Sequence, residues 1–350
     1  MSVPVRRVAA GLFAATLAAL AAGAPAGGPR DPYEAAVRRI ERGDLDGARA
    51  ALRDETKPAE VLRVLIDRRF EPLWDELETA TGGPRGAVER EIAAVVERRA
   101  AEPRSLDPVV RQLAALRAAG RAAEAVAVGE SVLPQLPGAD PAFDDLGAQT
   151  PWFLDRFAFA LADVGRMNEA HATLTAAGGQ GERWGAYVVD NVSQMLSGGW
   201  LLAMDAKPQE ALEHAAEAYQ RSYNTFGYMV TVVCARAQLD AAAGDQVAMQ
   251  RTLRELRRNR SNYPAAYQIS LHCVGRTDEA RELMIWRLET ERHRLDALQE
   301  LQDFAAPRYV PPFEQRVDEV RRAVRDDPEV RALVERYGRI RSWDLASLVL

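Results

Sequence analysis

Residues that could carry catalytic or metal chemistry are few and scattered along the 350 positions of the chain. Four histidines are present, His171, His214, His272 and His293, together with two cysteines. None of the histidines belongs to a His-Glu-x-x-His pattern. His272 precedes Cys273, but neighbouring side chains on a helix point about 100° apart, so this pair alone does not bind a metal. We therefore expect no metal and no cofactor.

Motifs for nucleophilic or phosphate chemistry are also missing. The chain has no Gly-x-Ser-x-Gly turn and no Gly-x-x-x-x-Gly-Lys loop. The glycine-rich residues 178–181 follow a predicted helix and contain no lysine, which indicates a loop between repeats. Acid–base catalysis requires two carboxyls whose environments separate their pKa values, and no carboxyl pair in the sequence shows this by itself. We expect a non-enzymatic protein; the alternative is an enzyme, or an accessory subunit, whose site is not visible in the sequence.

Charge and composition exclude further classes. The chain has 45 Lys+Arg against 51 Asp+Glu, a net charge of −6, and arginines alternate with acids without a sustained basic run. Nucleic-acid binding requires a concentrated positive patch, so we do not expect it. With 47% hydrophobic and 27% charged residues, the composition is that of a globular protein.

Residues 1–26 have the organisation of a secretory signal peptide. Arg6 and Arg7 precede an uncharged apolar run over 8–22, and Ala24-Pro25-Ala26 has the small-x-small pattern after which signal peptidase cleaves. The run is shorter than the roughly 20 residues that span a membrane. We expect cleavage after Ala26 and a secreted or periplasmic product without stable membrane insertion, the alternative being an uncleaved N-terminal anchor.

A recurring turn dominates the rest of the sequence. The pattern Gly-Arg-x-x-Glu-Ala occurs at 120–125, 165–170 and 275–280, and residues 206–211 repeat it with Ala206 in place of glycine. Apolar residues at helical spacing precede each turn. Glycine accepts the left-handed conformation that ends a helix, and the acidic residue falls in the first turn of the next helix. Helical units that recur along a chain with one turn glycine each are typical of stacked helical hairpins.

These residues resemble the tetratricopeptide repeat family, best over 151–177 and more broadly over 105–290. The resemblance implies an all-α fold, a right-handed superhelical stack of helix–turn–helix hairpins (an α-solenoid). The intervals between turns are mostly longer than the family's usual unit, so we expect irregular hairpins. We divide the chain into N-terminal capping hairpins over 27–104, repeats over 105–306 and a C-terminal helical cap over 307–350. Short apolar runs at 187–192 and 228–233 are assigned to helices.

The family binds peptides or protein segments on a concave face lined by first helices. Carrying its groove positions over by the turn glycine gives a putative protein-binding groove, whose principal members are Trp152, Asp155, Phe159, Asp163, Trp200, Met204, Gln238 and Asn262, with Ser193, Leu196 and Ile269 beside them. Aromatic and Met side chains beside acids suit an extended peptide with apolar and basic side chains. The alternative for Trp152, Phe159 and Trp200 is packing in the core.

Two cysteines one unit apart raise the question of a disulfide. Cys234 lies ten residues before Gly244, whereas Cys273 lies two residues before Gly275. If both glycines mark equivalent turns, this offset amounts to about 12 Å along a helix, which is beyond the reach of a disulfide. We therefore favour two separate buried thiols over an inter-repeat bridge.

Overall fold

The computed structural model describes residues 32–52, 57–136, 142–184, 188–221, 225–239 and 243–346, without the side chains of 178–193, 220–226 and 240–245. The signal peptide predicted over 1–26 lies outside the described residues. The described chain is almost entirely helical, which confirms the all-α prediction. Its elements are α1 (Pro32–Ile40), α2 (Leu45–Leu52), α3 (Pro58–Ile66), η1 (Arg68–Leu73), α4 (Trp74–Thr81), α5 (Gly83–Ala101), α6 (Asp107–Ala118), α7 (Ala122–Val132), η2 (Leu133–Gln135), α8 (Leu146–Asp163), α9 (Met167–Trp184), α10 (Val188–Met204), α11 (Pro208–Arg221), α12 (Thr225–Arg236), α13 (Ala243–Arg258), α14 (Pro264–Cys273), α15 (Thr277–Glu289), α16 (Glu291–Glu300), β1 (Asp303–Phe304), α17 (Pro312–Arg325), α18 (Pro328–Tyr337) and β2 (Ser342–Trp343).

Consecutive helices from α6 to α15 pack as hairpins. Within this region α6 contacts α8, α8 contacts α10, α10 contacts α12 and α12 contacts α14, so the first helix of each hairpin packs on the first helix of the next. Apolar side chains fill the space between these helices, and one continuous hydrophobic core runs through the stack. The runs at 187–192 and 228–233 fall largely within α10 and α12, as predicted.

The predicted turns share one hydrogen-bonded geometry. Gly120, Gly165 and Gly275 have φ between 70° and 85°, and Ala206 adopts the same left-handed conformation at φ 58°. In each turn the following residue donates its backbone N–H to the carbonyl five positions earlier, as Arg121 does to Leu116 at 2.8 Å. This bond is the 6→1 bond of a Schellman helix end. The interpretation of 206–211 as a turn copy with its glycine replaced is thus confirmed in geometry.

The arginine after each turn glycine links neighbouring hairpins. Arg166 pairs with Glu169 in its own turn and with Glu130 on α7 of the preceding hairpin, at 2.6 Å. Arg121 makes the same double contact with Glu124 and Glu89. The recurring spacing of arginine and glutamate within the motif therefore serves the junction between hairpins as well as the helix start.

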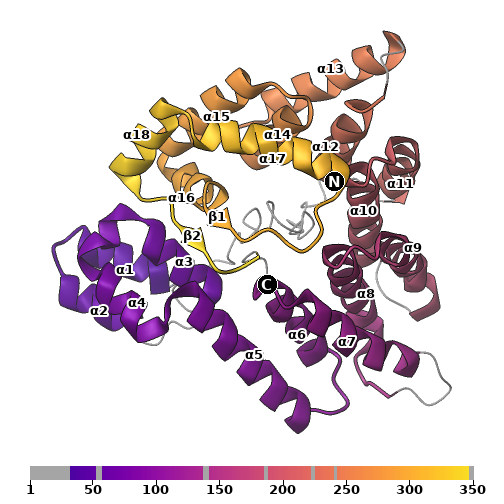
Figure 1. Cartoon of the computed structure of the whole chain (residues 1–350), viewed down its shortest axis with the longest axis horizontal. Coiled ribbons are helices and arrows are strands. Elements are labelled where there is room, and N and C mark those ends of the chain that lie inside the picture. Colours follow the sequence, from indigo (N-terminus) through magenta and orange to yellow (C-terminus); the bar gives the residue numbers. More distant parts are fainter. Residues whose placement is uncertain are drawn as a thin grey trace, which may run out of the picture.

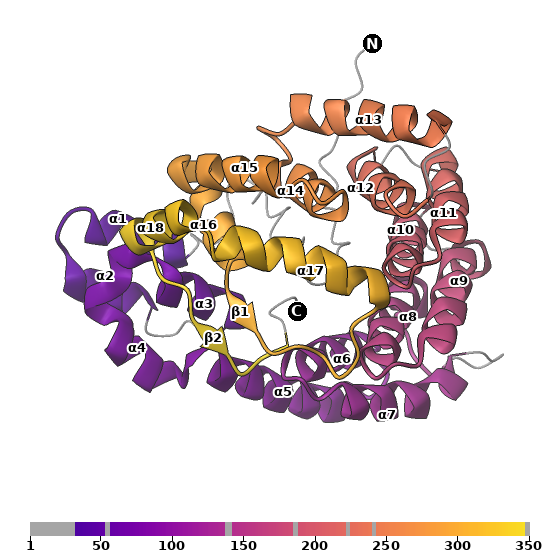
Figure 2. The same cartoon turned by 45° about the horizontal axis from the view of Figure 1, so that its top comes forward.

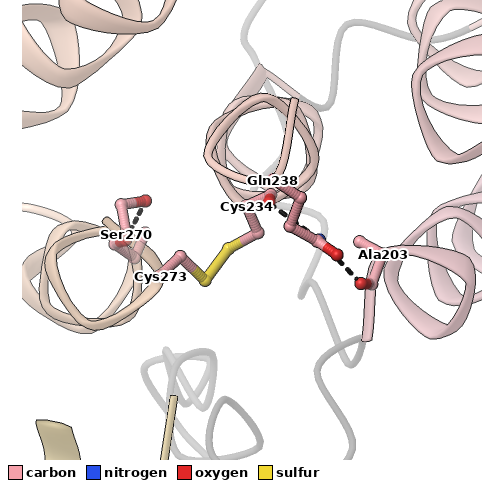
Figure 3. Close-up of a disulfide and its surroundings, with 6 residues drawn as sticks. Ala203, Cys234, Gln238, Ser270 and Cys273 are labelled. Carbon is pink, nitrogen blue, oxygen red and sulfur yellow. Dashed lines mark hydrogen bonds between the residues drawn. A yellow bond between two sulfur atoms is a disulfide. The ribbon is translucent and has the colours of Figure 1, made fainter. Parts of the chain in front are cut away.

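The prediction of two separate thiols is wrong, because Cys234 and Cys273 form a disulfide (Figure 3). The error came from anchoring Cys234 on Gly244. Helix α12 already ends at Arg236, and Gly244 lies inside α13 rather than in the turn. Cys234 is therefore close to the end of α12, just as Cys273 is the last residue of α14, and their Cα atoms lie 5.0 Å apart.

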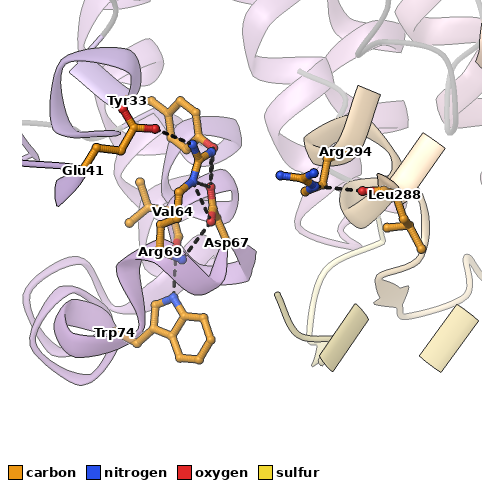
Figure 4. A network of polar contacts seen from close by, with 8 residues as sticks. All are labelled: Tyr33, Glu41, Val64, Asp67, Arg69, Trp74, Leu288 and Arg294. Carbon is orange, nitrogen blue, oxygen red and sulfur yellow. Dashed lines mark hydrogen bonds and ion pairs between the residues drawn. The ribbon is translucent and has the colours of Figure 1, made fainter. Parts of the chain in front are cut away.

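A polar network organises the N-terminal hairpins (Figure 4). The hydroxyl of Tyr33 donates to the buried carboxylate of Asp67 at 2.6 Å, and Arg69 pairs with the same carboxylate at 2.7 Å. Burial beside this carboxylate raises the pKa of the Tyr33 phenol. The indole of Trp74 donates to the carbonyl of Val64. The network fixes the corner between α3, η1 and α4.

The N-terminal hairpins contact the last helices of the described chain, so the helices form a closed ring (Figures 1 and 2). Helix α16 packs on α3, and α18 packs on η1. Gly338 pairs with Asp67 in an antiparallel bridge, and the backbone N–H of Arg339 donates to the carbonyl of Ile66. We call these contacts around Gly338 the clasp.

The last part of the chain runs along the inner side of the ring. Helix α17 crosses it and packs on α10, α14 and α15 (Figure 2). Strands β1 and β2 pair in parallel, with Asp303 opposite Ser342, and the backbone N–H of Ala346 donates to the carbonyl of Ala118 on α6. Residues 307–346 thus contact α6, α10 and the N-terminal hairpins as well as the last repeats.

Candidate functional site

The ring encloses a cavity of about 1010 Å³. Its walls come from the first helices of several hairpins on one side and from α17 and residues 302–311 on the other. A volume of this size accommodates several amino-acid side chains or a small organic molecule. We call it the central cavity.

Four of the predicted groove residues line this cavity: Phe159, Asp163, Trp200 and Met204. Phe159 and Asp163 are four residues apart near the end of α8, and Trp200 and Met204 have the same spacing on α10, so each pair shares a helix face. Trp200 is partly exposed, whereas Phe159 and Met204 are 6% and 1% exposed and also contribute to the core. Phe159 and Met204 therefore belong both to the cavity wall and to the hydrophobic core.

The other four principal groove residues do not line the cavity. Trp152 is partly buried near the start of α8, and Asp155 is buried between the helices, where burial raises the pKa of its carboxyl. The amide of Gln238 donates to the carbonyls of Ala203 and Cys234, which ties α12 to α10 (Figure 3). Asn262 is exposed in the turn before α14.

Two of the accompanying groove positions, Leu196 and Ile269, do not line the cavity. Leu196 and Ile269 are 1% and 3% exposed and belong to the core. The side chain of Ser193 lies outside the described residues.

Helix α17 supplies cavity residues that the sequence analysis missed. Glu314, Asp318, Arg321 and Arg325 follow one another at helical spacing and all line the cavity. Phe313, on the same helix, is buried in the hydrophobic core. The helical spacing of these charged residues can be seen in the sequence. The sequence does not show, however, that the helix lies on the inner side of the ring.

Most charged groups of the cavity wall are paired within the chain. Arg117 binds Asp163 through its Nε at 2.7 Å and lies over the ring of Phe159, with its guanidinium carbon 5.2 Å from the ring centroid. Arg321 pairs with Asp318, one turn earlier on α17. Tyr309 contributes its ring beside Gly165, and its backbone N–H donates to the carbonyl of Asp163 at 3.1 Å.

Two partly buried carboxyls of the wall have no such partner in the described part of the chain, Glu314 on α17 and Asp296 on α16. Burial raises the pKa of Glu314 to about 7, and the nearby carboxylates of Asp318 and Asp163 act in the same direction. Burial also raises the pKa of Asp296. Glu314 and Asp296 are thus the partly buried carboxyls of the wall that have no ion pair within the described residues.

The histidines do not converge on the cavity. His272 is buried at the end of α14, where burial lowers its pKa to about 3, and its Nε2 lies 3.0 Å from the amide nitrogen of Gln268. His171 contacts Asp205 through Nε2 at 2.9 Å, between α9 and the turn after α10. Across the described ranges, no group of three or more His, Cys, Asp or Glu side chains is arranged to hold a metal ion.

No helix among the described residues is both long and apolar enough to cross a membrane. Comparison of the chain with protein-family models, with curated proteins and with solved structures finds no match.

Proposed function

We propose that this chain is a non-enzymatic binding protein whose tetratricopeptide-like stack holds an extended peptide segment of a partner protein in the central cavity. One observation carries the proposal. Phe159, Asp163, Trp200 and Met204, four of the eight principal positions carried over from the family's groove by the turn glycine, line one cavity large enough for several side chains.

The chain's own C-terminal part supports this role. Residues 302–307 and 309–311 are non-helical and line the cavity, and the backbone of Tyr309 bonds to the carbonyl of Asp163 at the end of a first helix. Backbone bonds of this kind, combined with pockets for side chains, are how proteins recognise extended peptides.

A peptide display library screened against the purified chain tests the proposal. Trp200→Ala removes the partly exposed ring in the cavity, and we expect the affinity for selected peptides to fall on the order of 30-fold, as for a buried aromatic anchor. Trp152→Ala is the matched control, because Trp152 lies on the neighbouring first helix but not in the cavity wall. Equal losses in the two variants, or no selected peptide, would contradict the proposal.

The same complexes test whether the role is non-enzymatic. Peptides recovered after prolonged incubation should have an unchanged mass. A cleaved or modified peptide would instead favour an enzyme that uses the carboxyls of the cavity.

We also propose that the protein acts outside the cytoplasm, after cleavage following Ala26. The Cys234–Cys273 disulfide supports this location, because disulfides persist in oxidising compartments. N-terminal sequencing of the protein from its native host should begin at Gly27, and a product that begins at Met1 would refute the cleavage.

A further inference from the structure

Most arginines of the central cavity wall already pair with carboxylates of the chain. Arg117, Arg321 and Arg325 pair with Asp163, Asp318 and Asp303. Arg63 and Arg287 are paired in the same way, with Glu60 and Glu300. The remaining arginines of the wall, Arg292 and Arg322, bond to backbone carbonyls. An anionic ligand that binds one of the five paired arginines would therefore have to break an ion pair, whereas Arg292 and Arg322 have no carboxylate partner within the described residues and are exposed.

The carboxyls of the wall, by contrast, include one that has no ion pair in the described chain. Glu314 projects from the first turn of α17 into the cavity and is partly buried, with no ion pair or hydrogen bond within the described residues. Neighbouring carboxylates, Asp318 and Asp163, act against its ionisation, and Arg321 and Arg117 only partly offset them. A partly buried carboxylate without a partner is unfavourable, so a cation that reaches it gains a charge-assisted bond without displacing another group.

The shape and lining favour an organic cation over a metal ion. Two or more further oxygen or nitrogen ligands would be needed around a metal, and the described residues contain no such group. Trp200 and Tyr309 bring aromatic rings to the same cavity. Aromatic rings attract ammonium and guanidinium groups through their π faces, and they pack against the alkyl stem of a long basic side chain.

We infer that Glu314 is the anchor of a subsite for a basic side chain, the ammonium of a lysine or the guanidinium of an arginine in the bound peptide. The inference rests on the proposed function and names the feature by which a peptide is selected. In this arrangement the backbone of the ligand follows the first helices, and one basic side chain crosses the cavity to α17.

A double-mutant cycle on a selected peptide tests the subsite. We expect peptides selected on the wild-type protein to share one Lys or Arg. Replacing that residue by norleucine, or replacing Glu314→Gln in the protein, should each weaken binding on the order of 30-fold, the loss typical of truncating one partner of a desolvated charge pair. Applying both changes together should cause little further loss. Glu97→Gln is the matched control, because Glu97 is exposed on α5 and lies outside the cavity.

The outcomes separate the inference from the proposed function. Selected peptides without a shared basic residue, or equal binding by the wild type and Glu314→Gln, would overturn the subsite and leave peptide binding intact. Failure of the wild type to select any peptide would overturn both. Misfolding is excluded as a cause of lost binding if the far-ultraviolet circular dichroism and thermal unfolding of Glu314→Gln match or exceed those of the wild type.

Discussion

Replacement of Glu314 by glutamine should stabilise the protein, and the gain should depend on pH. The pKa of Glu314 is about 7 in the folded chain, against an ordinary value of 4.5. This difference corresponds to about 3 kcal/mol of unfolding free energy. The folded state therefore holds a proton that the unfolded state has already released between these two pH values, so the wild type loses stability as the pH rises from about 4.5 to about 7. Glutamine has the same shape and never ionises.

Urea unfolding of the full chain at pH 4 and pH 8 measures this effect. We expect Glu314→Gln and the wild type to unfold at similar urea concentrations at pH 4, where the carboxyl is protonated in both states. At pH 8 the variant should be more stable by up to about 3 kcal/mol. Other carboxyls, including Asp296, contribute equally to both proteins and cancel in the difference. Equal stabilities at pH 8, or a variant that is less stable there, would refute the view that Glu314 lacks a compensating partner.

Three other features lead to predictions. Ala206→Gly should raise the unfolding free energy by about 1 kcal/mol in thermal unfolding, because Ala206 adopts a left-handed conformation that favours glycine. Gly275→Ala should lower it by a similar amount, because Gly275 has the same left-handed conformation; nothing lies within 4 Å of the added methyl, so no steric clash adds to this cost. Two changes of the same sign would contradict this. Reduction of the disulfide between Cys234 and Cys273, which closes a loop over a separation of 39 residues, should cost about 4 kcal/mol in urea unfolding with and without a reductant, and an unchanged midpoint would show that the bond adds no constraint. In Gly338→Ala the new methyl would lie 2.2 Å from a carbonyl oxygen of the clasp, so hydrogen exchange of the clasp amides should accelerate while that of α10 stays slow; unchanged exchange would mean that the clasp accommodates the methyl.

Local features of the fold could be predicted from the sequence because they depend on neighbouring residues. The turns at Gly120, Gly165 and Gly275, and the equivalent turn at Ala206, follow from a six-residue pattern that ends one helix and begins the next. The positions of these turns also identified Trp200 as a groove residue, and Trp200 lines the cavity. Helix type and turn position are properties of short segments, which a single sequence shows.

The rest of the site depends on contacts between distant segments. Gly244 resembles a turn glycine but lies inside α13, so the end of α12 was placed too late and the disulfide was judged out of reach. Glu314 lies on a helix that any amphipathic cap would contain, and only the return of the chain across the ring makes it part of the cavity. Gly338 shows no local signal of its contact with Ile66, which is far away in the sequence.

The clasp at Gly338 changes how the stack responds to force. In an open stack of hairpins, small rotations at each junction add up, so the last hairpin can move far relative to the first. In the closed ring the clasp joins the first and last hairpins, so these rotations must cancel around the ring. A displacement of one hairpin is therefore distributed over the others. Widening the ring at one hairpin therefore strains the hydrogen bonds of the clasp near Ile66.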